Sequence, residues 1–297
     1  MVYRLARSRA ARNQLWGLLF TAPWIIGLLC FYAYPIVASL LYSFTSYNML
    51  QPPRWIGLEN FRFMLTDVHY ARAVYNTLWF VVVAVPINIV FSLIVATLLN
   101  QKLAFRSGLR TLCYLPTIVP QVASAMLWLW VFSPFGLIDG SLALLGLKAI
   151  PWLSDPQWTK PALTVVTCWI AGGNIVLFLA SLQDVPQHLK EAARIDGATW
   201  WEEQLHVVVP FITPTILFTV ITGMIWAFQY FTFAWIISGS GPGESTLFYA
   251  MYIYTNAFSN FRMGLAAAMA WALFLLIALL TLALFRSSSR WVYYGGD

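Results

Sequence analysis

Charge is scarce in this chain. Lys, Arg, Asp and Glu together make up 9% of the 297 residues, whereas a soluble globular domain carries about 25% charged residues. Hydrophobic residues make up 60%, and the mean hydropathy is +0.72. So few charges could not cover the surface of a soluble fold of this size. The composition therefore excludes a soluble enzyme, an intrinsically disordered protein and a secreted disulfide scaffold.

Cysteine and histidine are scarce as well. The three cysteines are far apart in apolar runs, so we interpret them as small buried hydrophobic residues rather than a disulfide framework. The three histidines have no acidic or cysteine partner at the spacing of metal ligands. The residues concerned are Cys30, Cys113, Cys168, His69, His188 and His206. Together they indicate no metal site and no intramembrane catalytic cluster.

A nucleotide-binding loop is also missing. Such a loop needs the pattern G-x-x-x-x-G-K-[ST] to hold phosphates, and the chain contains none. The glycine-rich stretch from Ser238 to Thr246 lacks the lysine and contains Glu244. We therefore expect the chain to be no enzyme, with no ATPase site and no cofactor of its own.

What the chain has instead is six long apolar runs. They cover roughly residues 16–44, 74–99, 112–132, 162–182, 212–237 and 265–285. Each has about 20 or more residues, enough to cross about 30 Å of hydrocarbon at 1.5 Å per residue. Several contain proline, which fits bent helices around a pathway. Ionisable residues are nearly absent from the runs, which argues against a proton relay or an ion-coupled carrier.

The basic residues predict the orientation. With the N-terminus inside, the inner segments carry eleven Lys and Arg residues and the outer segments six. Because basic residues collect on the cytoplasmic side, both termini are predicted to be cytoplasmic. The net charge of +6 then needs no nucleic-acid partner. We expect a cytoplasmic N-terminal segment at 1–15, a six-span domain at 16–286 and a cytoplasmic tail at 287–297. The inner basic residues are Arg4, Arg7, Arg9, Arg12, Lys102, Arg106, Arg110, Lys190, Arg194, Arg286 and Arg290.

The inner segment between the fourth and fifth runs, about 183–210, carries a distinctive pattern. Asp184 can cap and Pro186 can begin a short helix, and Gly197 suits its end because glycine accepts a positive φ. One side of this helix would carry Leu189, Ala192, Ala193 and Asp196. A second helical stretch, 201–209, follows the turn. Such a small, apolar, charge-edged surface can either sit in a cleft of another protein or pack on its own bundle.

The same segment resembles the signature of a transporter family. It reads Glu191-Ala192-Ala193-x-x-Asp196-Gly197-Ala198, with Pro210 thirteen residues after Gly197. This pattern resembles the EAA motif of binding-protein-dependent ABC import permeases. The Asp-Gly-Ala form with a leading Pro-x-x-Leu resembles the carbohydrate-import branch, similar to the maltose-transporter permeases. The stretches 55–61, 135–138 and 240–243 fit the same family. Gln204 departs from it, because that position is usually aromatic.

The resemblance implies a division of labour among subunits. The segment would be the coupling helix, lodged in a groove of a cytoplasmic ATPase: Glu191 would meet basic groups there, Ala192 and Ala193 would allow close approach, and Gly197 would permit the turn. Expected partners are a second related permease, two cytoplasmic ABC ATPases that hold ATP and Mg, an extracytoplasmic sugar-binding protein and membrane lipids. The location would be a bacterial or archaeal cytoplasmic (inner) membrane.

A few polar and aromatic residues in the runs suit a substrate path. Sugars need stacking surfaces and neutral hydrogen-bond partners. Gln229 and Tyr230, beside Trp226, resemble substrate-lining positions of the maltose permeases, and Asn174 and Trp169 in the fourth run are further candidates. In the alternative interpretation, Asn174 and Gln229 hydrogen-bond between helices as packing contacts.

The sequence thus predicts an all-α membrane protein of six transmembrane helices, with a short cytoplasmic coupling helix between helices four and five. The predicted function is that of a permease subunit of an ATP-driven ABC importer, forming part of the translocation path for a carbohydrate. A polyol or glycerol-phosphate cargo within the same importer class is one alternative, and an ion-coupled secondary transporter is another.

Overall fold

The computed structural model describes residues 2–101 and 104–293, without the side chains of residues 2–13 and 15. Lys102, which counts towards the predicted orientation, and residues 294–297 of the predicted tail lie outside the described residues, as do the side chains of the N-terminal arginines. The regular secondary structure of the described chain is helical except for one two-stranded hairpin. It forms two compact units, Met1–Phe63 with Asn256–Ala272 and Met64–Thr255 with Leu273–Asp297.

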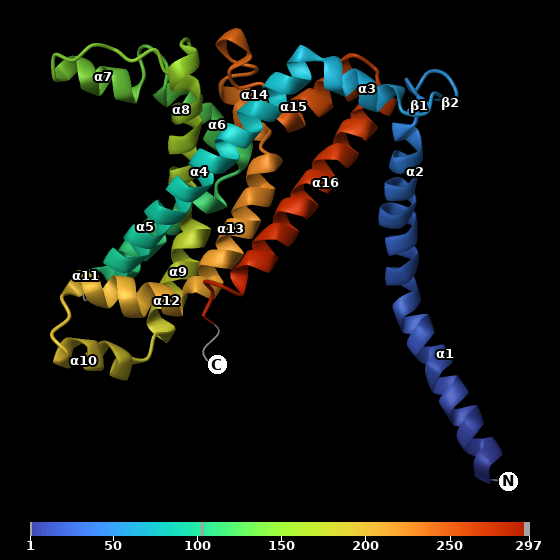
Figure 1. Cartoon of the computed structure of the whole chain (residues 1–297), viewed down its shortest axis with the longest axis horizontal. Helices are drawn as coiled ribbons and strands as arrows, with labels where there is room; N and C mark the ends of the chain where they lie inside the picture. Colours follow the sequence, from blue (N-terminus) through green and yellow to red (C-terminus); the bar gives the residue numbers. More distant parts are fainter. Residues whose placement is uncertain (1, 102–103, 294–297) are drawn as a thin grey trace. The chain divides into compact units, whose positions relative to one another are not determined.

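The first unit is built on one long helical segment and a hairpin. Its elements are α1 (Val2–Leu28), the π-helical turn η1 (Leu29–Ala33), α2 (Tyr34–Ser43), β1 (Thr45–Ser46), β2 (Arg54–Trp55), most of α3 (Glu59–Thr66), η4 (Thr255–Ser259) and the first part of α16 (Met263–Ser288), as Figure 1 shows. The strands are antiparallel, with Thr45 opposite Trp55. Asn60 donates to the carbonyl oxygens of Ser43 and Thr45 at 2.8 and 3.0 Å, which fixes α3 against the hairpin.

The second unit holds most of the chain, and α4 is its central helix. Its elements are α4 (Val68–Asn100), α5 (Arg106–Ile118), α6 (Gln121–Val131), α7 (Leu137–Leu144), α8 (Pro156–Trp169), α9 (Gly172–Asp184), α10 (Gln187–Ile195), α11 (Trp200–Glu203), η2 (Gln204–Val208), α12 (Val209–Phe211), α13 (Thr213–Phe228), α14 (Thr232–Ile237), η3 (Pro242–Glu244), α15 (Tyr249–Tyr254) and the rest of α16. Helices α8, α9, α13 and α15 all pack on α4 (Figure 1).

The helices confirm the predicted six-span architecture. Three continuous segments are long and apolar enough to cross a membrane: Trp16–Ser43, Val68–Asn100 and Met263–Ser288. Three more are bent helix pairs, α5 with α6 at 100°, α8 with α9 at 52°, and Trp200–Phe211 with α13 at 68°. With each bent pair counted as one span, the described chain has six.

The bent pairs fit the bent helices that the prolines in the apolar runs predict, and the structure locates the breaks. The third run is interrupted at Val119 and Pro120, whose extended backbone fits the fixed φ of proline. In the fifth run, helix α13 ends at Phe228, and residues 229–231 separate it from α14. Apolar periodicity does not reveal such breaks, because an apolar side chain suits a broken span as well as a straight one.

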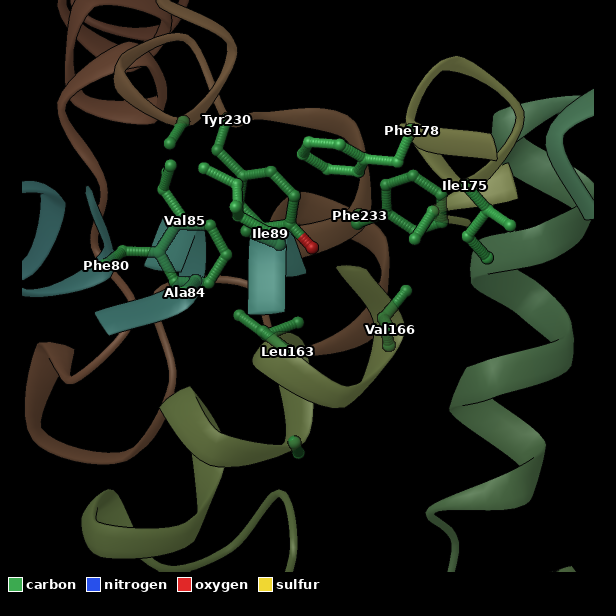
Figure 2. Packing of buried hydrophobic residues seen from close by; sticks show 14 of the residues in the cluster. Phe80, Ala84, Val85, Ile89, Leu163, Val166, Ile175, Phe178, Tyr230 and Phe233 are labelled. Carbon is green, nitrogen blue, oxygen red and sulfur yellow. The ribbon is translucent and has the colours of Figure 1, made fainter. Parts of the chain in front are cut away.

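Aromatic side chains form the centre of the second unit. Phe80 of α4 lies 4.5 Å from Tyr230 and 5.1 Å from Phe248 between ring centroids. Tyr230 stacks in turn on Phe233 at 6.2 Å. Figure 2 shows Phe80, Tyr230 and Phe233 together with Phe178 of α9, and Phe248 belongs to the same cluster. This core joins residues that are up to 168 positions apart, and it holds the breaks around residue 230 in place.

Two adjacent glycines at the start of α9 have opposite surroundings. A Cβ atom on Gly172 would lie 2.6 Å from the Cys113 carbonyl oxygen and 2.9 Å from the Tyr114 Cα atom. A Cβ atom on Gly173 would meet nothing within 4 Å. Gly172 therefore lets the backbones of α5 and α9 approach closely, as small residues do between membrane helices.

We expect Gly172→Ala to destabilise the protein by about 1–3 kcal/mol, because the added methyl group forces the α5 backbone away from α9. Gly173→Ala is the matched control and should stay within about 0.5 kcal/mol of the unaltered chain. The thermal midpoint of the purified protein in mild detergent measures both. Equal midpoints for the two variants would contradict the close approach.

Candidate functional site

The segment between α9 and α13 contains a tightly closed turn. Helix α10 ends at Ile195, and Gly197 has φ +86°. The Ala198 amide donates to the Ala193 carbonyl at 3.0 Å, and the Gly197 amide donates to the Arg194 carbonyl at 3.1 Å. This pair of bonds is the Schellman motif, which satisfies the last carbonyls of a helix. The helix end that the sequence predicts at Gly197 is confirmed.

The start of α10 differs from the prediction. Asp184 does not cap this helix, because it is the last residue of α9. Pro186 occupies the N-cap position and offers no side-chain hydrogen bond. The prediction of Asp184 as the cap was wrong because α9 continues two residues beyond the apolar run, and a capping signal in the sequence does not show to which helix the residue belongs.

The second helix of the segment begins with a capping box. Glu202 and Thr199 bond reciprocally: the Thr199 amide donates to the Glu202 carboxylate at 2.7 Å, and the Glu202 amide donates to the Thr199 hydroxyl at 3.4 Å. The backbone and hydroxyl hydrogen bonds from Thr199 lower the pKa of Glu202. The turn between α10 and α11 therefore comprises only four residues, 196–199. The Schellman motif fixes its start and the capping box fixes its end.

An ion pair closes the segment from the side. Arg194 of α10 donates through Nε and Nη2 to the two carboxylate oxygens of Glu203 at 2.7 and 3.2 Å. Glu203 is buried, while more than half of the Arg194 side chain is exposed. The hydrogen bonds and charge of Glu203 raise the pKa of Arg194. Because a bidentate pair fixes the direction of the two side chains as well as their distance, it holds α10 and α11 in a fixed relative position. Sequence reasoning did not single out either residue.

Much of the outer face of this turn is exposed. Among the motif residues, Glu191, Ala192, Asp196 and Gly197 are exposed, and Ala193 and Ala198 are partly buried. Beside them, Ile195 is 86% exposed, Trp201 69% and Leu205 60%. We call the exposed set Glu191, Ala192, Ile195, Asp196, Gly197, Trp201 and Leu205 the turn surface. Large apolar side chains left bare in this way mark an interaction site, which favours docking over packing on the chain's own bundle.

A cavity of about 420 Å³ lies in the second unit, between α4, the α5–α6 break, the α8–α9 break and α13. None of its lining residues is charged. The polar and aromatic ones include Asn88, Gln121, Asn174, Thr222 and Trp226. A cavity with neutral hydrogen-bond partners and an indole ring has the character of a site for a polar, uncharged ligand.

Two asparagines from different helices are joined at the cavity wall. Asn174 Nδ2 donates to Asn88 Oδ1 at 2.9 Å, and Asn88 Nδ2 donates to the Thr167 carbonyl at 2.7 Å. At the α8–α9 break the Ala171 amide donates to the Cys168 carbonyl instead, so Thr167 loses its helical donor and Asn88 replaces it. Asn88 was missed in the sequence, although an asparagine within an apolar run is itself a signal.

The structure divides the predicted substrate-path residues. Trp226 and Asn174 line the cavity. Tyr230 is buried in the aromatic core, where its hydroxyl has no hydrogen-bond partner among the described residues. Gln229 is exposed just after α13. Trp169 packs edge-on against Trp128 at 5.7 Å and lies outside the cavity lining. The transport role of all five stays a prediction. Within the described residues, no three His, Cys, Asp or Glu side chains could share a metal ion.

Comparison with known proteins places the chain among transport components. A family model described as "Binding-protein-dependent transport system inner membrane component" matches residues 88–292. The probable ABC transporter permease protein YesP of Bacillus subtilis (strain 168) is 39% identical over 98% of this chain and 96% of its own length. The lactose transport system permease protein LacF of Rhizobium radiobacter is 34% identical over 92% of this chain and 93% of its own length.

Among solved structures, a chain of a bacterial alginate ABC transporter, crystallised with an alginate pentasaccharide-bound periplasmic protein, has the same fold. Its TM-score is 0.84 at 24% identity, and the match covers 97% of this chain and 98% of that chain.

The positive φ at Gly197 leads to a prediction. Gly197→Ala should cost roughly 1–2 kcal/mol, because a Cβ atom is strained in the left-handed region, and amides 187–199 should exchange with solvent about 5- to 30-fold faster. Hydrogen–deuterium exchange of the purified protein measures this. Gly197→Asn is the control, since asparagine tolerates this conformation, and it should exchange much closer to the unaltered rate. Identical exchange in the alanine variant and the unaltered chain would contradict the role of the turn.

Proposed function

Since the chain belongs to the binding-protein-dependent transport system inner membrane component family, we propose that it is a permease subunit that forms part of the translocation path of an ATP-driven carbohydrate importer. Its span count and its similarity to the permeases YesP and LacF support this assignment. The protein is a membrane-embedded transport component. Its location would be a bacterial or archaeal cytoplasmic membrane, with both termini in the cytoplasm.

The observation that carries the proposal is the turn surface on its rigid support. It presents Glu191, Ala192, Asp196 and Gly197 of the motif outward, on a turn closed by a Schellman motif, a capping box and the Arg194–Glu203 ion pair. Because these contacts hold the turn rigidly, a force that a partner exerts on the turn surface would displace the whole segment instead of deforming the turn. The partner we propose is a cytoplasmic ABC ATPase, one of two that would hold ATP and Mg, because the chain has no phosphate-binding loop of its own.

The chain connects the segment that carries this turn to the cavity. Helix α9 starts beside the cavity-lining Ala171 and ends at Asp184, separated from α10 only by Val185 and Pro186. Helix α13 begins at Thr213, separated from α12 only by Ile212, and carries Trp226 on the cavity wall. A displacement of the turn therefore moves two cavity walls together. In this mechanism closure of the ATPases alternates the access of the cavity between the two sides of the membrane.

The cavity supports a neutral polyhydroxylated cargo. The Asn88–Asn174 pair offers amide donors and acceptors, and Trp226, which is 37% exposed, offers a ring face. A phosphate group would need a basic partner, which this cavity wall lacks. A sugar therefore fits better than a glycerol phosphate, and a polyol remains the alternative cargo. A second related permease would supply the opposite wall, and an extracytoplasmic sugar-binding protein would deliver the cargo.

We expect Glu191→Lys to abolish import while the protein still reaches the membrane, because it reverses a charge on the turn surface. The measurement is uptake of whichever labelled oligosaccharide the unaltered complex transports, together with recovery of the ATPase on purification. Asp184→Lys, an equal charge reversal at the end of α9 and outside the motif, should retain most uptake. Normal import by the Glu191 variant would refute the docking role.

The cavity predicts a different phenotype for Trp226→Leu. Loss of the stacking ring should raise the KM for uptake about tenfold, which corresponds to the loss of roughly 1–2 kcal/mol of binding, while the complex still assembles. Trp235→Leu is the control, because Trp235 is similarly exposed on α14 but lies outside the cavity. An unchanged KM in the Trp226 variant would show that this wall does not contact the cargo.

A further inference from the structure

Two arginines converge on one neutral side chain at the end of the second unit where α4 and α9 terminate. With the amide oxygen of Gln183 turned towards α5, that oxygen accepts from Arg110 Nη2 at 2.8 Å and from Arg106 Nη2 at 3.0 Å. Arg106 also donates through Nε to the carbonyl oxygen of Leu99 at 3.0 Å. Both guanidinium groups are therefore held in fixed positions within hydrogen-bond distance of the same oxygen.

The positive charge of this pair is not balanced within the described protein. The ion pairs found among the described side chains involve neither Arg106 nor Arg110. The acceptors that the two arginines do have, Leu99 O and the Gln183 amide, are neutral. Nε of Arg110 is buried and has no hydrogen-bond partner among the described residues. Two half-buried like charges with neutral partners are costly unless an anion joins them.

The pair lies beside an apolar surface. Arg106 and Arg110 are one turn apart on α5. Next to them on α5, Leu112 is 65% exposed and Leu109 37%, and these two positions fall on one helical side. Phe105, the N-cap residue of α5, is 90% exposed. Gln183 is the last residue but one of α9, so the pair lies at the same end of the second unit as the turn surface. A basic pair next to an exposed apolar stripe is typical of the boundary between headgroups and hydrocarbon.

We propose that Arg106 and Arg110 bind the phosphate of an anionic phospholipid, whose acyl chains lie along Phe105, Leu109 and Leu112. This inference rests on the membrane placement under the proposed function, and it is independent of the cargo. The planar guanidinium fork matches phosphate oxygens better than a lysine ammonium does. The bound phosphate supplies the missing negative charge and joins the ends of α4, α5 and α9, next to the turn that would receive the ATPase.

The test is native mass spectrometry of the purified transporter complex in mild detergent, titrated with phosphatidylglycerol or with phosphatidylcholine of the same acyl chains. We expect the unaltered complex to retain phosphatidylglycerol preferentially. The double variant Arg106→Gln with Arg110→Gln should lose that preference by roughly tenfold, in line with the loss of two basic residues at a membrane surface. Equal retention by the double variant and the unaltered complex would overturn the proposal.

Matched variants separate the site from simpler explanations. Arg286→Gln with Arg290→Gln removes the same charge from two exposed arginines at the end of α16, and it should leave phosphatidylglycerol retention unchanged. Gln183→Leu removes the neutral amide that accepts from both arginines but keeps the arginines themselves. This variant should retain the lipid even if its thermal midpoint falls. Loss of the lipid in either control, or dissociation of the ATPase from the Arg106/Arg110 variant with lipid retention intact, would contradict the lipid site.

A final arm distinguishes the lipid from free phosphate. Inorganic phosphate at millimolar concentration should not displace phosphatidylglycerol, because the acyl chains contribute contacts that the free ion lacks. Displacement by phosphate alone would assign the pair to a soluble anion and overturn the lipid proposal. The readout does not depend on transport, so it remains valid if the cargo of the importer differs from a sugar.

Discussion

The hydrogen bond from Asn88 to the Thr167 carbonyl shows the constraint on which this architecture depends. Hydrocarbon offers no hydrogen-bond partners, so each backbone group released by a broken span must be satisfied inside the protein. The α8–α9 break releases the Thr167 carbonyl, and the 2.7 Å bond from Asn88 satisfies it. Asn88 in turn accepts from Asn174. The break is therefore tolerated, and the polar groups that make it tolerable also line the cavity.

The same constraint accounts for the hydroxyl groups in the spans. Ser92, Thr97 and Thr219 each donate to a carbonyl three or four residues earlier on their own helix. A hydroxyl that is satisfied locally imposes no partner on a neighbouring helix. Polar contacts that cross between helices include the Asn88–Asn174 pair at the cavity and the Ser181–Thr215 pair between α9 and α13.

Charged side chains, unlike these polar ones, lie away from the cavity. The arginines and carboxylates described above lie towards helix ends, away from the cavity. Arg194 forms an ion pair with Glu203, and Arg106 and Arg110 both donate to the Gln183 amide oxygen. The cavity wall itself is uncharged. This separation lets an apolar bundle carry a neutral cargo, while ionic contacts fix the surfaces that face partners and headgroups. Helices α9 and α13 join the rigid turn at one end to the neutral cavity within the bundle.

Local signals in the sequence determined the helical class, the number of spans and the turn at Gly197. Each depends on neighbours within one or two turns: an apolar run, a glycine that accepts positive φ, a Thr199–Glu202 capping pair. The breaks at residues 170 and 229 and the composition of the cavity were decided only by tertiary structure. Asn88 and Asn174 are 86 positions apart, and Tyr230 is turned into the core by Phe80 and Phe248. No periodicity records such contacts, because which polar group faces a cavity depends on how distant helices pack.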